Sequence, residues 1–202
     1  MLTDVQKNEK INIAIFASGA GSNARAILKH FNHHSRIKVT LIVTNKSDAG
    51  VIKVAEDFNV EVAVISNAIL KDESQMIIIL DKHCVSFIVL AGFLLLIPAY
   101  LIHLFQKRIV NIHPALLPNF GGKGMYGQFV HEAVKNAGAF ETGITIHFCN
   151  EHYDEGDIVF QARCKIDESD SPDDIARKVL ALEHQYYAKQ IEMIVMNDEV
   201  KE

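Results

Sequence analysis

Over its first 112 residues the chain alternates short apolar runs with amphipathic stretches. Runs rich in Ile, Val and Phe have the length and composition of buried strands, at 11–17, 37–44, 60–65, 87–90 and 108–112. Stretches between these runs have the spacing of helices, at 24–31, 51–58 and 75–82. Continuous apolar strands alternating with helices predict a Rossmann-like α/β fold, with a mostly parallel sheet and helices on both faces.

The pattern changes after residue 112, where a loop rich in Pro and Gly leads to a helix predicted at 129–136. Two further runs are spaced as an antiparallel strand pair, at 143–148 and 158–164. A final amphipathic helix begins near residues 171–174, because Ser171 can cap it and Pro172 suits a first turn. We find no repeat or linker, so one α/β domain is expected.

The composition is that of a globular protein. Of the 202 residues, 49% are hydrophobic and 22% charged, which is too apolar for a disordered chain. A net charge of -5 provides no broad basic surface, so we expect no nucleic-acid partner. Three cysteines without a C-x-x-C spacing argue against a disulfide framework and against a cysteine zinc site.

Membrane and secretory signals are not expected either. The longest apolar run, 87–99, contains Pro98 and is shorter than a membrane span. The first ten residues are polar and include acidic side chains, unlike a signal peptide. The sequence therefore predicts a cytoplasmic protein with no membrane partner.

A glycine-rich turn, S-G-A-G-S-N at residues 18–23, lies between the first predicted strand and the first helix. Free amides at a helix N-terminus bind anions, and glycine permits close approach of the ligand. The turn loosely matches a dinucleotide pattern, but the acid expected after the second strand is replaced by Thr44 and Asn45. We interpret it as a site for a phosphate monoester; the alternative is a purely structural tight turn.

Asn111 and His113 lie at the end of the fifth apolar run, at the sheet edge where ligands of open α/β folds bind. They are two residues apart, so both side chains leave the same side of an extended chain. An amide donor beside an imidazole suits stabilisation of a developing oxyanion and proton transfer. A lone histidine is more often structural, so the surrounding motif must decide.

The motif N-I-H-P-A-L-L-P at 111–118, preceded by V-L-A-G-F and followed by H-Y-D-E-G-D, resembles the phosphoribosylglycinamide formyltransferases of purine biosynthesis. Together with A-S-G-A-G-S-N at 17–23 the combination is specific, and the similarity extends to L-E-H near residue 183. The resemblance implies a formyltransferase fold in one domain, 1–202. It further implies a phosphate-binding half at about 10–110 and a folate-binding, catalytic half at about 111–202.

The resemblance also assigns residues. It implies that Asn111, His113 and Asp154 are catalytic. It implies that the substrate phosphate is bound by Gly21, Ser22 and Asn23, and that Glu183 contacts the glycinamide end of the ribonucleotide. The folate pocket is implied to lie between two chain segments and to include Asn111, its residues being Leu94, Leu95, Leu96 and Ile97, and Asn150, Glu151, His152, Tyr153 and Asp154.

The implied reaction moves the formyl group of 10-formyltetrahydrofolate, the co-substrate, to the amine of glycinamide ribonucleotide through a tetrahedral intermediate. Asn111 and a protonated His113 would donate to its oxyanion. Asp154 would raise the pKa of His113 and so keep it charged. No metal is expected, and the partners are two small molecules acting on a monomer or homodimer.

Two features depart from the family pattern. Leu95 stands where many members carry arginine. The loop G-G-K-G-M-Y-G at 121–127 replaces a more usual Pro-Gly-Leu-His pattern and brings Lys123 and Tyr126 to the mouth of the pocket.

Three alternative functions remain open at this point. A formyltetrahydrofolate deformylase shares the Asn-His-Asp set but uses water as acceptor and needs an additional regulatory domain. A methionyl-tRNA formyltransferase shares the H-P-x-L-L-P segment but needs a basic domain for tRNA. A vestigial folate- or nucleotide-binding module would not need all three of Asn111, His113 and Asp154.

Overall fold

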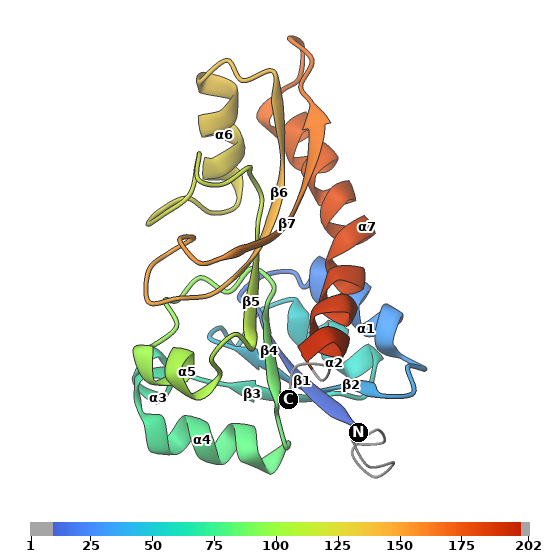
Figure 1. Cartoon of the computed structure of the whole chain (residues 1–202), viewed down its shortest axis with the longest axis vertical. Helices are drawn as coiled ribbons and strands as arrows, with labels where there is room; N and C mark the ends of the chain where they lie inside the picture. Colours follow the sequence, from blue (N-terminus) through green and yellow to red (C-terminus); the bar gives the residue numbers. More distant parts are fainter. Residues whose placement is uncertain (1–9, 199–202) are drawn as a thin grey trace.

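The computed structural model describes residues 10–198, and one seven-stranded sheet runs through them in the order β3-β2-β1-β4-β5-β6-β7 (Figure 1). Strands β1 to β5 pair in parallel, whereas β5–β6 and β6–β7 are antiparallel. This confirms the predicted α/β fold with its antiparallel C-terminal pair. The strand bounds are β1 (Ile11–Phe16), β2 (Ile37–Thr44), β3 (Glu61–Val64), β4 (Phe87–Leu90), β5 (Ile109–His113), β6 (Glu141–Phe148) and β7 (Ile158–Lys165).

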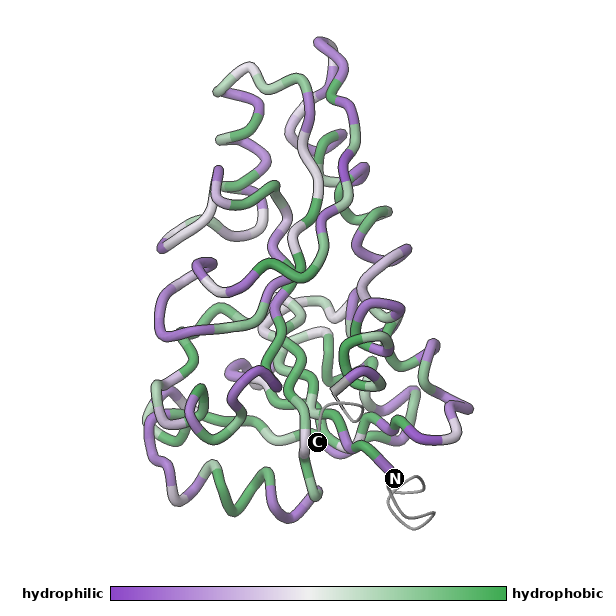
Figure 2. Tube along the Cα trace, viewed as in Figure 1, coloured by the Kyte–Doolittle hydropathy of each residue, from purple (hydrophilic) through white to green (hydrophobic). Residues whose placement is uncertain are grey.

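Helices cover both faces of the sheet. They are α1 (Ser22–Phe31), α2 (Val51–Asp57), α3 (Asn67–Lys71), α4 (Glu73–Lys82), α5 (Ala99–Leu104), α6 (Gln128–Asn136) and α7 (Pro172–Asp198). Alternate residues of the central strand enter separate cores: Ile13 and Ile15 pack with α1, α2, α6 and α7, whereas Ala14 and Phe16 pack with α3, α4 and α5. Hydrophobic segments accordingly run through the sheet while polar residues follow the outer helix faces (Figure 2).

Two short helices, α3 and α5, were not predicted. Each has less than two turns, too few for a periodic pattern to be recognised. Local caps explain where α3 and α4 begin: Ser66 accepts a hydrogen bond from the Ile69 amide, and Asp72 accepts one from the Gln75 amide. The isoleucine run at 77–79, equally compatible with a strand, lies inside α4.

The sheet has its topological switch point between β1 and β4, because the chain adds strands outward from β1 on one side and from β4 on the other. Ligands of open α/β sheets bind outside the carboxyl ends of the strands at such a point. The glycine-rich turn follows β1, and Asn111 and His113 are in the last three residues of β5. The topology therefore brings both predicted motifs to one edge.

The long helix α7 is tied to this edge by Tyr187, which is 1% exposed. Its hydroxyl donates to the carbonyl oxygen of Leu90 at 2.8 Å and lies 3.3 Å from that of Val110. These carbonyls belong to the last residue of β4 and to the residue before Asn111.

Of the helices in residues 10–198, none is both long and apolar enough to cross a bilayer.

Replacing Tyr187 with Phe removes this buried hydroxyl, so the carbonyls of Leu90 and Val110 lose its hydrogen bonds. The free energy of unfolding should therefore fall by about 1–3 kcal/mol. Urea unfolding followed by circular dichroism measures the change. Tyr186→Phe is the matched control, because the Tyr186 ring packs on Phe160 and its hydroxyl makes no hydrogen bond within residues 10–198. An equal loss in both variants would contradict the assigned role of the Tyr187 hydroxyl.

Candidate active site

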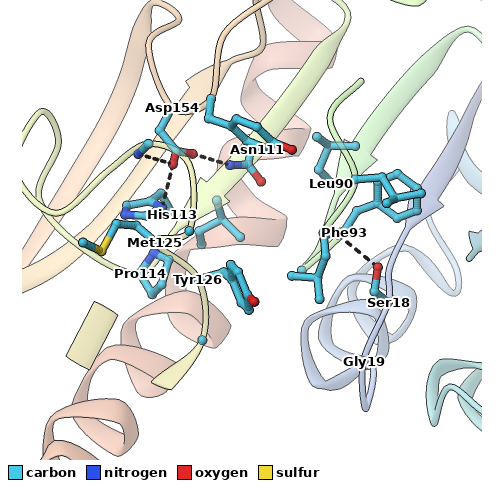
Figure 3. A pocket seen from close by; sticks show the side chains of 18 of the residues that line it. Ser18, Gly19, Leu90, Phe93, Asn111, His113, Pro114, Met125, Tyr126 and Asp154 are labelled. Carbon is cyan, nitrogen blue, oxygen red and sulfur yellow. Dashed lines mark hydrogen bonds and ion pairs between the residues drawn. The ribbon is translucent and has the colours of Figure 1, made fainter. Parts of the chain in front are cut away.

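A cavity of about 780 Å³ opens at the carboxyl ends of β1, β4 and β5 (Figure 3). One side is formed by the turn after β1, through Ser18, Gly19 and Asn23. The segment after β4 forms an apolar wall, and the end of β5 with the loop between β6 and β7 forms a polar one. The cavity thus joins the two motifs that the sequence singled out.

The glycine-rich turn presents the N-terminus of α1 to this cavity. Gly21 is the N-cap residue with φ 80°, and a Cβ there would lie 2.8 Å from Cα of Val51, so both conformation and space require glycine. Gly21 itself is buried and Ser22 is exposed outside the cavity lining, whereas Asn23 lines it. The first-turn amides of α1 have no side-chain cap, which leaves them available to an anion.

Glu183 of α7 lies against this turn. Its Oε2 accepts a hydrogen bond from Nδ2 of Asn23 at 2.7 Å. Burial raises the pKa of the Glu183 carboxyl, and the Asn23 hydrogen bond opposes that shift. The structure therefore places Glu183 beside the glycine-rich turn and in the cavity lining.

Ser18 connects the turn to the apolar wall, a role that its sequence context did not reveal. Its hydroxyl donates to Oδ1 of Asn45 at 2.5 Å and accepts from the Leu94 amide at 3.0 Å. The Ser18 amide also donates to the carbonyl of Gly92. These bonds fix the segment after β4 against the turn after β1.

The two predicted folate segments face this cavity with one exception. Its lining includes Leu94, Leu95, Leu96 and Ile97, and Asn150, His152, Tyr153 and Asp154. Glu151 does not line it; its carboxylate is exposed and lies 3.3 Å from the His103 ring. Lys123 and Tyr126, from the loop at 121–127, do line it.

Asn111, His113 and Asp154 come together at the polar end of the cavity (Figure 3). Nδ2 of Asn111 donates to Oδ1 of Asp154 at 3.4 Å. Nδ1 of His113 lies 3.5 Å from Oδ2 of the same carboxylate. Two of the residues that the resemblance grouped as catalytic, Asn111 and His113, therefore both contact the third, Asp154, whose backbone is left-handed at φ 58°.

His147 also joins this cluster. It is directly opposite Asn111 in the β5–β6 register, and its Nε2 lies 3.1 Å from Nδ2 of Asn111. Its Nδ1 lies 2.9 Å from the carbonyl oxygen of Phe148, which can only accept, so Nδ1 carries the proton and Nε2 accepts from Asn111. Strand register would have been the signal, because antiparallel pairing aligns these two positions.

The loop after His113 completes the cluster with backbone groups. The carbonyl of Phe120 lies 2.8 Å from Nε2 of His113, so this nitrogen carries a proton. The Gly122 amide donates to Oδ2 of Asp154 at 2.9 Å. A Cβ on Gly121 would lie 2.5 Å from Leu117 and 3.3 Å from Cβ of Asp154, so the loop can approach this closely only with glycine.

Burial and neighbouring charges have opposing effects on the pKa values of His113 and Asp154. Burial lowers the pKa of His113 below its ordinary value, while the charge of Asp154 raises it and His147 lowers it. Burial opposes ionisation of Asp154, but its contacts with His147, His113 and the Gly122 amide together lower the pKa of its carboxyl. Asp154 therefore raises the pKa of His113, as expected, but burial lowers this pKa by more, so the net shift is downward.

A metal site is not formed by these side chains. Within residues 10–198, His, Cys, Asp and Glu do not gather in any group of three or more that is arranged to hold a metal ion. The cluster is instead satisfied by hydrogen bonds among its own members and the loop backbone.

Comparison with known proteins identifies the family. A family model described as formyl transferase matches residues 11–191. A phosphoribosylglycinamide formyltransferase of Bacillus subtilis (strain 168) is 35% identical over 187 residues, which are 90% of this chain and 93% of that protein. A crystal structure of the phosphoribosylglycinamide formyltransferase from Anaplasma phagocytophilum superposes with a TM-score of 0.85 at 28% identity, covering 94% of this chain and 88% of that one.

A chloroplastic phosphoribosylglycinamide formyltransferase of Arabidopsis thaliana is 43% identical over 185 residues. These cover 89% of this chain but only 63% of the plant protein, so the chain spans less than two thirds of that relative's length. The matches nevertheless extend over the turn, the cavity walls and the polar cluster. The chain therefore belongs to the formyl transferase family.

Proposed function

We propose that this chain transfers the formyl group of 10-formyltetrahydrofolate to the amine of glycinamide ribonucleotide, a step of purine biosynthesis. The observation that carries this proposal is the cluster of Asn111, His113 and Asp154 in one cavity with a free helix N-terminus. A helix N-terminus suits a phosphate, and the apolar wall suits a flat ring system. The names of the relatives support the same pair of substrates.

In this proposal the ribonucleotide lies along α1 and α7. The first-turn amides of α1, reached through Gly21 and Ser22, hold its phosphate, and Asn23 adds a side-chain contact. Glu183 orients Asn23 through their hydrogen bond, and it contacts the glycinamide end of the ribonucleotide. The folate occupies the space between residues 94–97 and the loop at 150–154, with its reacting end at Asn111.

Asn111 stabilises the negative charge that develops on the formyl oxygen. One of its amide protons is held by His147 at 3.1 Å, and the other makes a longer bond to Asp154 at 3.4 Å. The longer and weaker bond is the one we expect to be exchanged for the substrate oxygen. The pairing with His147 keeps the amide oriented while this exchange occurs.

His113 moves protons through its Nδ1 atom. The Phe120 carbonyl holds the proton on Nε2, so Nδ1 is the atom that takes up and releases one. When Nδ1 is protonated, the imidazolium faces Asp154 and donates to the substrate. The proton lost by the attacking amine passes to the departing folate nitrogen by way of this atom.

The remaining parts of the proposal concern the whole chain. We propose that residues 1–202 act as one domain, with two small-molecule substrates, no nucleic acid and no metal, as a monomer or homodimer. A cytoplasmic location is also proposed from the sequence. The plant relatives are named chloroplastic, so localisation by a fluorescent fusion in the source cell is the direct test.

The function is tested by mixing the protein with 10-formyltetrahydrofolate, with and without glycinamide ribonucleotide, and following deformylated folate. We expect product only when the ribonucleotide is present, with formylated ribonucleotide formed in equal amount. Product without the ribonucleotide would identify a deformylase. No product in either mixture would overturn the proposal and favour a binding module.

The phosphate site is tested by Ser22→Asp. An acidic residue in the first turn stabilises a helix, so thermal stability should be kept, but its charge repels a phosphate dianion bound there. We expect the KM for the ribonucleotide to rise by roughly tenfold or more, since about 1.4 kcal/mol of repulsion is already tenfold. The KM for folate should change little.

Ser35→Asp, on the exposed loop after α1, is the control for a general charge effect. Equal changes in both Michaelis constants, or equal effects of the two variants, would place the phosphate elsewhere.

The coupling of His113 to Asp154 is tested by Asp154→Asn. Removing the carboxylate charge should lower the pKa of His113 further, because this charge opposes the effect of burial. The protonated form is lost as pH rises through this pKa, so the fall in kcat should begin at lower pH in the variant. NMR titration of the His113 ring reads the pKa directly.

Asp157→Asn is the matched control, since Asp157 is exposed on the same loop and lies 3.9 Å from Lys107. An unchanged His113 pKa in Asp154→Asn would refute the coupling, whatever happens to activity.

A further inference from the structure

His131 is a buried histidine that the proposed reaction has not used. It lies on α6 beside Val130 and one turn before Val134, both of which are fully buried, and is itself 6% exposed. Its Nδ1 atom is completely buried without a hydrogen-bond partner among the described residues. His131 also lines the cavity that contains His113. Packing alone would favour an apolar residue there, because a buried polar atom without a partner is destabilising.

Three other side chains of the cavity that could take up a proton already have partners. His147 uses Nδ1 for the Phe148 carbonyl and Nε2 for Asn111. Asp154 accepts from the Gly122 amide and Asn111, and Glu183 accepts from Asn23. His131 makes no such bond within residues 10–198, so its imidazole is uncommitted until a ligand binds.

The surroundings favour the neutral form of this imidazole. Burial lowers the pKa of His131, and the positive charge of His113 lowers it further. The other charged or titratable groups lining the cavity are Lys46 after β2, Lys123 and Tyr126 in the loop before α6, His147 of β6, Cys149, His152, Tyr153 and Asp154 between β6 and β7, and Glu183 of α7. Both imidazoles line the cavity, but only His113 has a carboxylate 3.5 Å from its ring, so His113 is the acid of the pair and His131 the base.

We propose that His131 is a further catalytic residue of this cavity, a general base that takes a proton from the ammonium group of the acceptor before the amine attacks. This inference rests on the proposed function. His131 takes one proton from the ammonium group, and the free amine nitrogen bonds to the formyl carbon. The bond from that carbon to the folate nitrogen then breaks, and this nitrogen receives a second amine proton through His113. The proton on His131 returns to water after the products leave, so atoms and charge balance.

The test compares His131→Gln with the wild-type protein at saturating 10-formyltetrahydrofolate, varying the ribonucleotide and pH. Glutamine can hydrogen-bond but cannot take up a proton, so kcat should fall by about 100-fold with little change in KM. Wild-type activity should rise as His131 deprotonates. Activity of the variant should instead rise at higher pH, near the pKa of an amino group at about 8, because it then depends on amine that is already free.

His184→Gln is the matched control, since His184 is exposed on α7 and is not part of the cavity lining. Added imidazole should restore part of the activity of His131→Ala, a result that a purely structural role would not give. Circular dichroism checks that each variant is folded.

A normal kcat and an unchanged pH profile in His131→Gln, with an active wild-type protein, would overturn the inference while leaving the proposed function intact. A wild-type protein that forms no product from the two substrates would overturn both. A measurement without variants is NMR of the wild-type histidine rings on addition of glycinamide ribonucleotide alone. We expect the His131 nitrogen signals to shift; their constancy at saturating ribonucleotide would also overturn the inference.

Discussion

A carboxylate removed from water must find its hydrogen bonds within the protein, and Asp154 obtains them from three separate parts of the chain. The Gly122 amide and the Asn111 side chain donate to it, and the rings of His113 and His147 lie within 3.5 and 3.6 Å. Its own backbone is left-handed at φ 58°. The polar groups of β5, β6 and the loop at residue 122 therefore meet at this one side chain.

The same burial that strengthens these contacts also determines the protonation of each group. It lowers the pKa of His113 and opposes the ionisation of Asp154, so the two groups retain their charges only through each other and the surrounding amides. The balance between burial and these contacts therefore governs the protonation of both groups. The apolar wall after β4 keeps this balance by excluding water from one side of the cavity.

Much of this arrangement could be predicted from the sequence. The parallel strands are continuous apolar runs, and the two-residue spacing of Asn111 and His113 puts both on one side of β5. The contribution of Asp154 came from the resemblance of the H-Y-D-E-G-D motif, because 43 residues separate it from Asn111.

The rest could not be predicted because it depends on distances through space. His147 becomes a partner of Asn111 only through the β5–β6 register. The Phe120 carbonyl and the Gly122 amide are backbone groups with no signature in the sequence. The pKa of His113 depends on the depth of burial, and the absence of a partner for His131 Nδ1 among the described residues appears only when neighbouring atoms are placed.

The hydrogen bond from Asn23 to Glu183 joins residues 160 positions apart in the chain. During synthesis on the ribosome, the turn after β1 emerges long before α7, so the proposed site for the ribonucleotide is incomplete until α7 docks beside α1. A ligand bound across both helices stabilises the docked state by mass action, and local opening of α7 becomes rarer as the ligand concentration rises. Resistance of the C-terminal helix to proteases would then report the supply of substrate in the cell.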